Sequence, residues 1–264
     1  MNQYGSAQIV RNIQIPKAVL AGSSINSRGK LFVLSIGAEY DLQNATYALN
    51  DARAFYRHIV GESDRFTSVE SQMLVNGGSK PPNRANIQAA LKWLQQATPD
   101  DTVVVFVAGH GVLQGRDYYF LGTDAQTDRL RDTAVPWTLF QTALENTRGQ
   151  RVLIVDTCYA QNAFNPTLLK NTADAQIALF SATNNAGQLA EVLNEHRQGA
   201  LTWALLNGMR GEADLGQPAN QQVDLYELRN YVQQMVPQHT GYRQRPEVHL
   251  GRSMDNFVLS RVAQ

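Results

Sequence analysis

The chain has 264 residues, with 23 Lys and Arg against 23 Asp and Glu, 43% hydrophobic residues and a single cysteine. One cysteine cannot form a disulfide within the chain, so a disulfide-stapled secreted scaffold is excluded, as are zinc and iron–sulfur sites built from several cysteine thiolates. A formal net charge of zero argues against a protein built mainly to bind nucleic-acid phosphates or an anionic membrane. We therefore expect neither nucleic acid nor membranes among its partners.

The N-terminal residues lack the basic start and apolar run of a signal peptide. The longest uninterrupted apolar stretch, 103–108, is far too short for a transmembrane helix. We therefore expect a cytoplasmic protein. Residues 1–30 are expected to form an N-terminal extension, in which 9–16 alternates weakly like an edge strand and 21–30 is small and polar like a linker.

From residue 31 onward, short hydrophobic runs alternate with amphipathic segments. The predicted elements, in chain order, are a strand at 31–37, a helix at about 44–60, a strand at 71–76, a helix at 85–97, a strand at 102–109, a small hairpin at 118–125, a helix at 137–146, strands at 151–157 and 176–182, and helices at 199–210 and 224–236. This alternation predicts one α/β domain over 31–264, with a mostly parallel sheet covered by helices.

Two residues with reactive side chains follow predicted strands. Gly109-His110-Gly111 ends the strand at 102–109, and Asp156-Thr157-Cys158 ends the strand at 151–157. Ligands of open parallel sheets bind outside the carboxyl ends of the strands. If these two strands are neighbours, the only cysteine and one of the five histidines can meet at one edge of the sheet.

A cysteine beside a histidine can act as a nucleophile. The imidazole takes the thiol proton, the sulfur attacks a carbonyl, and the resulting oxyanion needs N–H donors. The backbone amides of Gly111 and Cys158 are the natural donors. Taken singly, a cysteine at a strand end is more often a small buried hydrophobic residue, and Gly-His-Gly is more often a turn. Together at one sheet end they favour catalysis.

Four segments resemble the successive blocks of caspase-like cysteine peptidases, with bacterial caspase-family proteins and metacaspases as the nearest likeness. They are FVLSIGAEYDLQNATYALNDARAFYRHI, DDTVVVFVAGHG, RVLIVDTCYA and GALTWALLNGMRGEAD. The resemblance runs from about Leu31 to Leu259, and AGHG and DTCYA are its most specific parts.

The resemblance implies a three-layer αβα sandwich of the caspase–haemoglobinase type and a dyad of His110 and Cys158. It also implies a large-subunit-like part at about 31–165 and a small-subunit-like part at about 176–260. The sequence departs from the family pattern at Tyr159, where histidine is common, and at Gln161, where relatives often have glycine.

The residue two positions before the cysteine bears on specificity. Animal caspases have glutamine there and bind acidic side chains, whereas this chain has Asp156. An aspartate in the primary pocket would attract a substrate Lys or Arg. The metacaspase pattern adds a second aspartate, matched here by Asp51, and Ala108 leaves room beside the site. Alternatively, Asp156 caps a helix or turn and Asp51 is a solvated helix residue.

Three further expectations concern the loops. Lys170, the one basic residue between the cysteine and the next strand, is a candidate self-processing site. The loop 187–198 precedes the GALT block, which in the family helps line the substrate cleft, and this loop is expected to be mobile. No metal or cofactor is expected, because the scattered acids do not follow an EF-hand pattern, although some metacaspases need calcium; these acids are Asp117, Asp124, Asp128 and Asp132.

The favoured hypothesis is a cysteine endopeptidase acting on peptides or proteins with a basic residue before the cleaved bond. The alternative is a catalytically silent caspase-like scaffold or regulatory domain. A flavodoxin-like nucleotide binder is disfavoured, because IGAEYD has only one glycine after the first strand. Bacterial relatives are often attached to sensor or repeat modules, so a fused or associated module of this kind is an expected partner.

Overall fold

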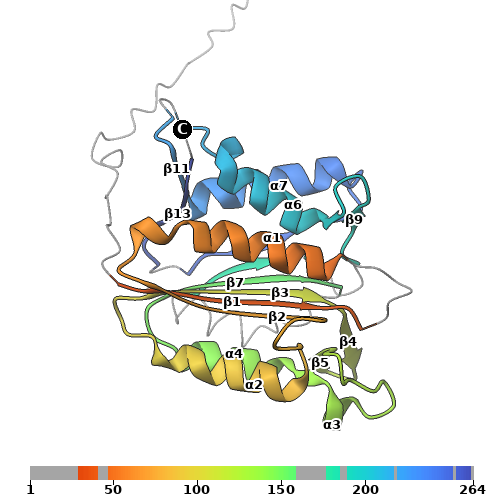
Figure 1. Cartoon of the computed structure of the whole chain (residues 1–264). Coiled ribbons are helices and arrows are strands. Elements are labelled where there is room, and N and C mark those ends of the chain that lie inside the picture. Colours follow the sequence, from red (N-terminus) through yellow and green to blue (C-terminus); the bar gives the residue numbers. More distant parts are fainter. Residues whose placement is uncertain are drawn as a thin grey trace, which may run out of the picture.

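The computed structural model describes residues 29–40, 47–158, 177–184, 189–216, 219–251 and 254–262. Its centre is a six-stranded sheet with five parallel strands and one antiparallel edge strand (Figure 1). In spatial order the strands are β12 (Glu247–His249), β8 (Ile177–Ser181), β7 (Gln150–Thr157), β3 (Thr102–Gly109), β1 (Leu31–Ala38) and β2 (Val69–Val75). The predicted α/β fold with a mostly parallel sheet is confirmed.

The central strands are buried on both faces because helices cover both faces (Figure 1). Every residue of β1 and β3 is buried, which explains why both appear in the sequence as continuous apolar runs without alternation. On one face lie α1 (Ala48–Gly61), α6 (Ala200–Asn207) and α7 (Leu225–His239); on the other lie α2 (Arg84–Trp93) and α4 (Trp137–Glu145).

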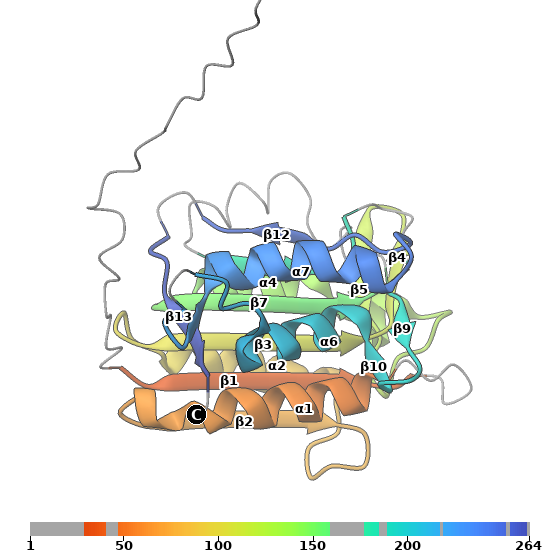
Figure 2. The same ribbon diagram turned by 90° about the horizontal axis from the view of Figure 1, so that it is seen from above.

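The two helical layers enclose two hydrophobic cores. The helical spacing of Ala48, Ala52, Phe55 and Ile59 gives α1 its buried face, and the Phe55 ring stacks on Phe106 of β3 at 4.6 Å between centroids. Seen from above, α1 lies over the β1–β2 side of the sheet and α7 lies toward β12 (Figure 2). The strands that lead to His110 and Cys158 are therefore held between two hydrophobic cores, one on each face of the sheet.

Several short elements complete the chain. The predicted hairpin is present but begins earlier, and the loop expected at 187–198 carries a second hairpin in its described part. These elements are β4 (Gly111–Gln114), β5 (Asp117–Phe120), β6 (Val135–Pro136), β9 (Val192–Leu193), β10 (Gln198–Gly199), β11 (Gln222–Asp224) and β13 (Val258–Arg261), with short helices η2 (Ser63–Arg65), η3 (Leu94–Gln96), α3 (Leu130–Thr133) and η5 (Gly208–Glu212). The weak strand expected at 9–16 lies outside the described residues.

None of the helices within the described ranges combines the length and the apolar character needed to cross a bilayer.

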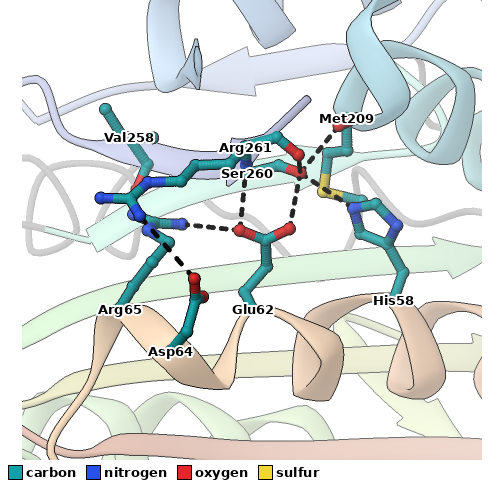
Figure 3. Close-up of polar contacts among 8 residues, drawn as sticks. All are labelled: His58, Glu62, Asp64, Arg65, Met209, Val258, Ser260 and Arg261. Carbon is teal, nitrogen blue, oxygen red and sulfur yellow. Dashed lines mark hydrogen bonds and ion pairs between the residues drawn. The ribbon is translucent and has the colours of Figure 1, made fainter. Parts of the chain in front are cut away.

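A polar network fastens the last strand, β13, to the end of α1 (Figure 3). The carboxylate of Glu62 accepts hydrogen bonds from the Ser260 hydroxyl at 3.2 Å and from the Arg261 amide at 2.9 Å. The fully buried Ser260 hydroxyl also lies 3.0 Å from His58 Nε2 and 2.7 Å from the Met209 carbonyl oxygen. One hydroxyl therefore joins α1, η5 and β13.

Replacing Ser260 by alanine is expected to lower the free energy of unfolding by about 1–3 kcal/mol, because it leaves buried polar partners without their hydrogen bond. Urea denaturation monitored by circular dichroism measures this loss. Ser63→Ala, at an exposed serine nearby, is the matched control and should change stability by less than about 0.5 kcal/mol. Equal stability of the Ser260 variant and the wild type would show that the network contributes nothing.

Candidate active site

The strands β3 and β7 place His110 and Cys158 side by side. The two strands pair in parallel, and their last partners are Ala108 with Asp156 and Gly109 with Thr157. His110 directly follows Gly109, and Cys158 directly follows Thr157. Both residues therefore leave the sheet at the carboxyl ends of two neighbouring strands. The condition stated from the sequence, that these two strands are neighbours, is therefore met.

The Cys158 side chain is half-buried beside segment 189–191. Burial raises the pKa of its thiol, and the nearby Asp156 and Glu191 carboxylates raise it further. The Ala190 amide donates a hydrogen bond to the sulfur and opposes this shift. The resting thiol is therefore neutral at physiological pH, and an attack through sulfur needs a base to remove its proton.

The hairpin of β4 and β5, which begins immediately after His110, contacts the backbone of both residues. The Leu121 amide donates to the His110 carbonyl oxygen at 2.9 Å. From β5, the Tyr118 hydroxyl donates to the Cys158 carbonyl oxygen at 2.9 Å. Tyr118 was not among the predicted site residues, because a tyrosine in a short strand has the sequence signal of an ordinary packing residue.

Glycine is required on both sides of His110 for steric reasons. Gly109 has φ +147°, and a Cβ there would lie 2.6 Å from the Ala38 carbonyl oxygen. A Cβ at Gly111 would lie 1.7 Å from the Tyr118 hydroxyl oxygen. Because Leu121 bonds back to His110, the next pair, Gly111 with Phe120, is a non-hydrogen-bonded pair. The Gly111 N–H therefore points away from β5.

Asp51 and Asp156 come together around Gly199, at the junction of β10 and α6. Both carboxylate oxygens of Asp51 accept from the Gly199 amide, at 3.0 and 3.2 Å. Oδ2 of Asp156 accepts from the Thr202 hydroxyl at 2.6 Å and from the Thr202 amide at 3.1 Å. A Cβ at Gly199 would lie 2.5 Å from Asp156 Oδ2 and 3.1 Å from Asp51 Oδ2.

The two aspartates form a buried pair of like groups. Their side chains belong to residues that are 1% and 6% exposed. The spacing around Gly199 places them within the roughly 4–6 Å over which one carboxylate disfavours ionisation of another. Burial raises the pKa of Asp156, and burial together with the Asp156 charge raises the pKa of Asp51 well above its usual value.

These positions settle the alternatives for the two aspartates. The alternative that Asp51 is a solvated helix residue is wrong, because the first turn of α1 packs under the start of α6 and the carboxylate binds the Gly199 amide. Asp156 does bind an amide in the first turn of α6, so the capping alternative holds alongside its place next to Asp51. Ala108, the register partner of Asp156, is a buried residue beside it.

Gln244 holds the segment that faces Cys158. Its side-chain oxygen accepts from the Glu191 amide at 2.7 Å, and its side-chain nitrogen donates to the Ala182 carbonyl oxygen at 2.9 Å. Gln244 is fully buried. A glutamine in a polar stretch gives no sequence signal of this role, since only the tertiary fold brings residues 182 and 191 to it.

The acidic residues considered for calcium do not converge. The Asp124 carboxylate accepts from the Arg84 amide at 3.0 Å, and Asp132 pairs with Arg129 at 3.3 Å. In the part of the chain that the structure describes, no three His, Cys, Asp or Glu side chains form a group that could hold a metal ion. Lys170, Tyr159 and Gln161 lie outside the described residues.

Comparisons with known proteins agree with the fold. A family model described as the caspase domain matches residues 31–258. Among solved structures, the fold is similar to the crystal structure of caspase-1 from Spodoptera frugiperda, with a TM-score of 0.52 and 14% sequence identity over 90% of this chain and 91% of that chain. No curated protein matches the sequence. Because the family model spans most of the chain, this protein belongs to the caspase family of cysteine peptidases.

Proposed function

We propose that this protein is a cysteine endopeptidase that cleaves peptide bonds after Arg or Lys. The observation that carries the proposal is the register of β3 and β7, since His110 and Cys158 follow the last paired residues of these neighbouring strands. That is where parallel sheets bind their ligands. The family membership supports the same reaction class.

In the proposed reaction, His110 removes the proton from the Cys158 thiol, whose pKa is raised by burial. The sulfur attacks the carbonyl carbon of the scissile bond, and the oxyanion accepts hydrogen bonds from the Gly111 and Cys158 amides. His110 then gives its proton to the leaving amine, which leaves an acyl-enzyme. Water, deprotonated by His110, hydrolyses the thioester and regenerates the thiol.

The proposed specificity rests on Asp51 and Asp156. Two carboxylates facing one small volume around Gly199 attract a cation and repel an acidic side chain. Arginine can bind two carboxylates through its planar fork of N–H donors, and lysine can bind them as a point charge. The lack of a side chain at Gly199 lets both carboxylates approach this point, since a Cβ there would lie 2.5 Å from Asp156 Oδ2.

The alternative, a catalytically silent caspase-like domain, is favoured by one observation, the raised pKa of Cys158, which makes the resting thiol a weak nucleophile. His110, which follows the neighbouring strand at the same end of the sheet, can remove this obstacle by taking the thiol proton. The presence of both His110 and Cys158 therefore favours the enzyme.

A panel of fluorogenic peptides that differ only in the residue before the cleaved bond tests the proposal. Peptides with Arg and Lys should be cleaved, and peptides with Asp should be cleaved at least about 10²-fold less efficiently, because a like charge replaces an attractive pair. Parallel assays with calcium and with a chelator measure any calcium dependence. Cleavage after Asp alone would overturn the assigned specificity, and no cleavage of any peptide would favour the silent domain.

A further inference from the structure

Tyr118 connects the hairpin of β4 and β5 to the end of β7. Its hydroxyl oxygen lies 2.6 Å from Thr157 Oγ1 and 2.9 Å from the carbonyl oxygen of Cys158. Tyr118 is 4% exposed and Thr157 is 1% exposed, so water does not replace these bonds readily. A residue 40 positions away in sequence thus binds the backbone of the proposed nucleophile.

The direction of these hydrogen bonds follows from their chemistry. A carbonyl oxygen can only accept, so the single proton of the Tyr118 hydroxyl goes to the Cys158 carbonyl. The Thr157 hydroxyl must then donate to the Tyr118 oxygen. Burial raises the pKa of Tyr118, which keeps its hydroxyl protonated and able to donate. The result is a chain of two bonds that runs from Thr157 through Tyr118 to Cys158.

The ring of Tyr118 is fixed independently of its hydroxyl. It makes an edge-on contact with Trp137 at 5.8 Å, and Trp137 in turn stacks on Phe140 at 4.7 Å, both from α4. Gly111 leaves the space for the hydroxyl, because a Cβ there would lie 1.7 Å from it. The position of the hydroxyl is therefore set by packing, and the Cys158 carbonyl is held against a rigid group.

We infer that Tyr118 is a positioning residue for Cys158: by holding the Cys158 carbonyl it fixes the backbone rotation that aims both the sulfur and the Cys158 amide. The inference rests on the proposed cysteine peptidase function. Tyr118 acts through the backbone of Cys158, and its hydroxyl, whose one proton is already used, has no role in proton transfer to the substrate. Its loss should therefore affect the chemical step more than substrate binding.

The test is Tyr118→Phe, which keeps the ring packing and removes only the hydroxyl. With an Arg peptide, kcat is expected to fall roughly 10–100-fold, since small misplacements of a catalytic group have effects of this size, while KM stays within about twofold. Tyr119→Phe is the matched control; its ring belongs to a separate cluster with Leu121 and Leu130, and its kcat should equal that of the wild type.

Two further variants separate positioning from folding. Thr157→Ser keeps the donor hydroxyl and should retain activity, whereas Thr157→Val removes it and should lower kcat with KM unchanged. Thermal melting reports whether each variant is folded. A Tyr118→Phe kcat within twofold of the wild type, or a loss of kcat matched by Tyr119→Phe, would overturn the inference; if Tyr118→Phe does not fold, equal kcat for the two Thr157 variants would overturn it.

A second readout distinguishes failure of this inference from failure of the proposed function. If the wild type cleaves no Arg or Lys peptide, the proposed function fails, and the rate of Cys158 alkylation by iodoacetamide against pH then decides the inference alone. The profile of Tyr118→Phe is expected to shift to higher pH, because a misaimed thiol loses the help of His110. Identical profiles for the variant and the wild type would contradict the role of Tyr118.

Discussion

Cys158→Ala should abolish cleavage of Arg and Lys peptides, lowering kcat by roughly 10⁴-fold or more, because loss of the nucleophile removes the covalent pathway. His110→Ala should lower kcat by at least roughly 10²-fold, the usual contribution of a general base. In this protein the base is needed all the more, since burial raises the pKa of the Cys158 thiol. Initial rates with a fluorogenic Arg peptide measure both effects.

The control for these variants is His249→Ala, at a half-exposed histidine on the edge strand β12, which should leave kcat unchanged. Thermal melts should show all three variants folded, because neither dyad residue lies inside a strand of the central sheet. Full activity of Cys158→Ala would disprove the assigned nucleophile. Alkylation of wild-type Cys158 no faster than that of free cysteine would favour the silent domain.

Asp156→Asn and Asp51→Asn should each lower kcat/KM for Arg and Lys peptides by roughly 10²-fold or more, because each removes one of the two carboxylates proposed to bind the substrate cation. The loss should appear mainly in KM, since these carboxylates bind a side chain away from the cleaved bond. Asp100→Asn, at an exposed aspartate, is the matched control. Unchanged kcat/KM in both site variants would remove the two aspartates from the specificity site.

The same pair predicts a dependence on pH. Burial raises the pKa of both carboxyl groups, and a protonated carboxyl does not attract a cation. KM for Arg peptides should therefore rise as the pH falls, beginning above the usual aspartate pKa of about 3.9. The double variant Asp51→Asn, Asp156→Asn should show no such rise.

The stability of the folded protein should depend on pH in the opposite sense to peptide binding: binding improves as the pH rises, whereas stability falls. A group whose pKa is raised by folding stabilises the native state below its unfolded pKa, and this contribution is lost as the pH rises through the folded pKa. Asp51→Asn lacks this loss, so its melting temperature relative to the wild type should increase as the pH rises above the unfolded aspartate pKa of about 3.9. A constant difference between the two proteins across this range would contradict a raised pKa for Asp51.

The central strands and the positions of His110 and Cys158 at strand ends could be predicted from the sequence because their signals are local. The strand predicted at 102–109 is β3, with the same bounds. A strand that is buried on both faces can be recognised from its continuous apolar run alone, without knowing which strands pair with it. The placement of His110 and Cys158 needed only the rule that chemistry lies at the carboxyl ends of parallel strands. The sequence alone does not establish that β3 and β7 are neighbours, because strand order in a sheet depends on the tertiary fold.

The contacts that the sequence could not reveal join distant segments of the chain. Tyr118 binds Cys158 across 40 positions, and Asp51 binds Gly199 across 148. Ser260 lies on β13, a strand of four residues whose pairing with β11 is too short to give a periodic signal. Burial of an acidic residue in the first turn of a helix cannot be inferred from helical spacing, because Asp is common there when exposed.

The pairing of β3 with β7 has a consequence for how this chain can vary. The spacing of His110 and Cys158 is set by the hydrogen-bond ladder from Thr102 to Gly109, and the β4–β5 hairpin region contacts the backbone of both residues. The connections beyond that hairpin, up to the start of β7, can therefore be lengthened or exchanged without moving the dyad. Deleting one residue inside either strand, by contrast, turns its terminal side chain to the opposite face of the sheet. We therefore expect this chain to tolerate insertions in those connections but not deletions within β3 or β7.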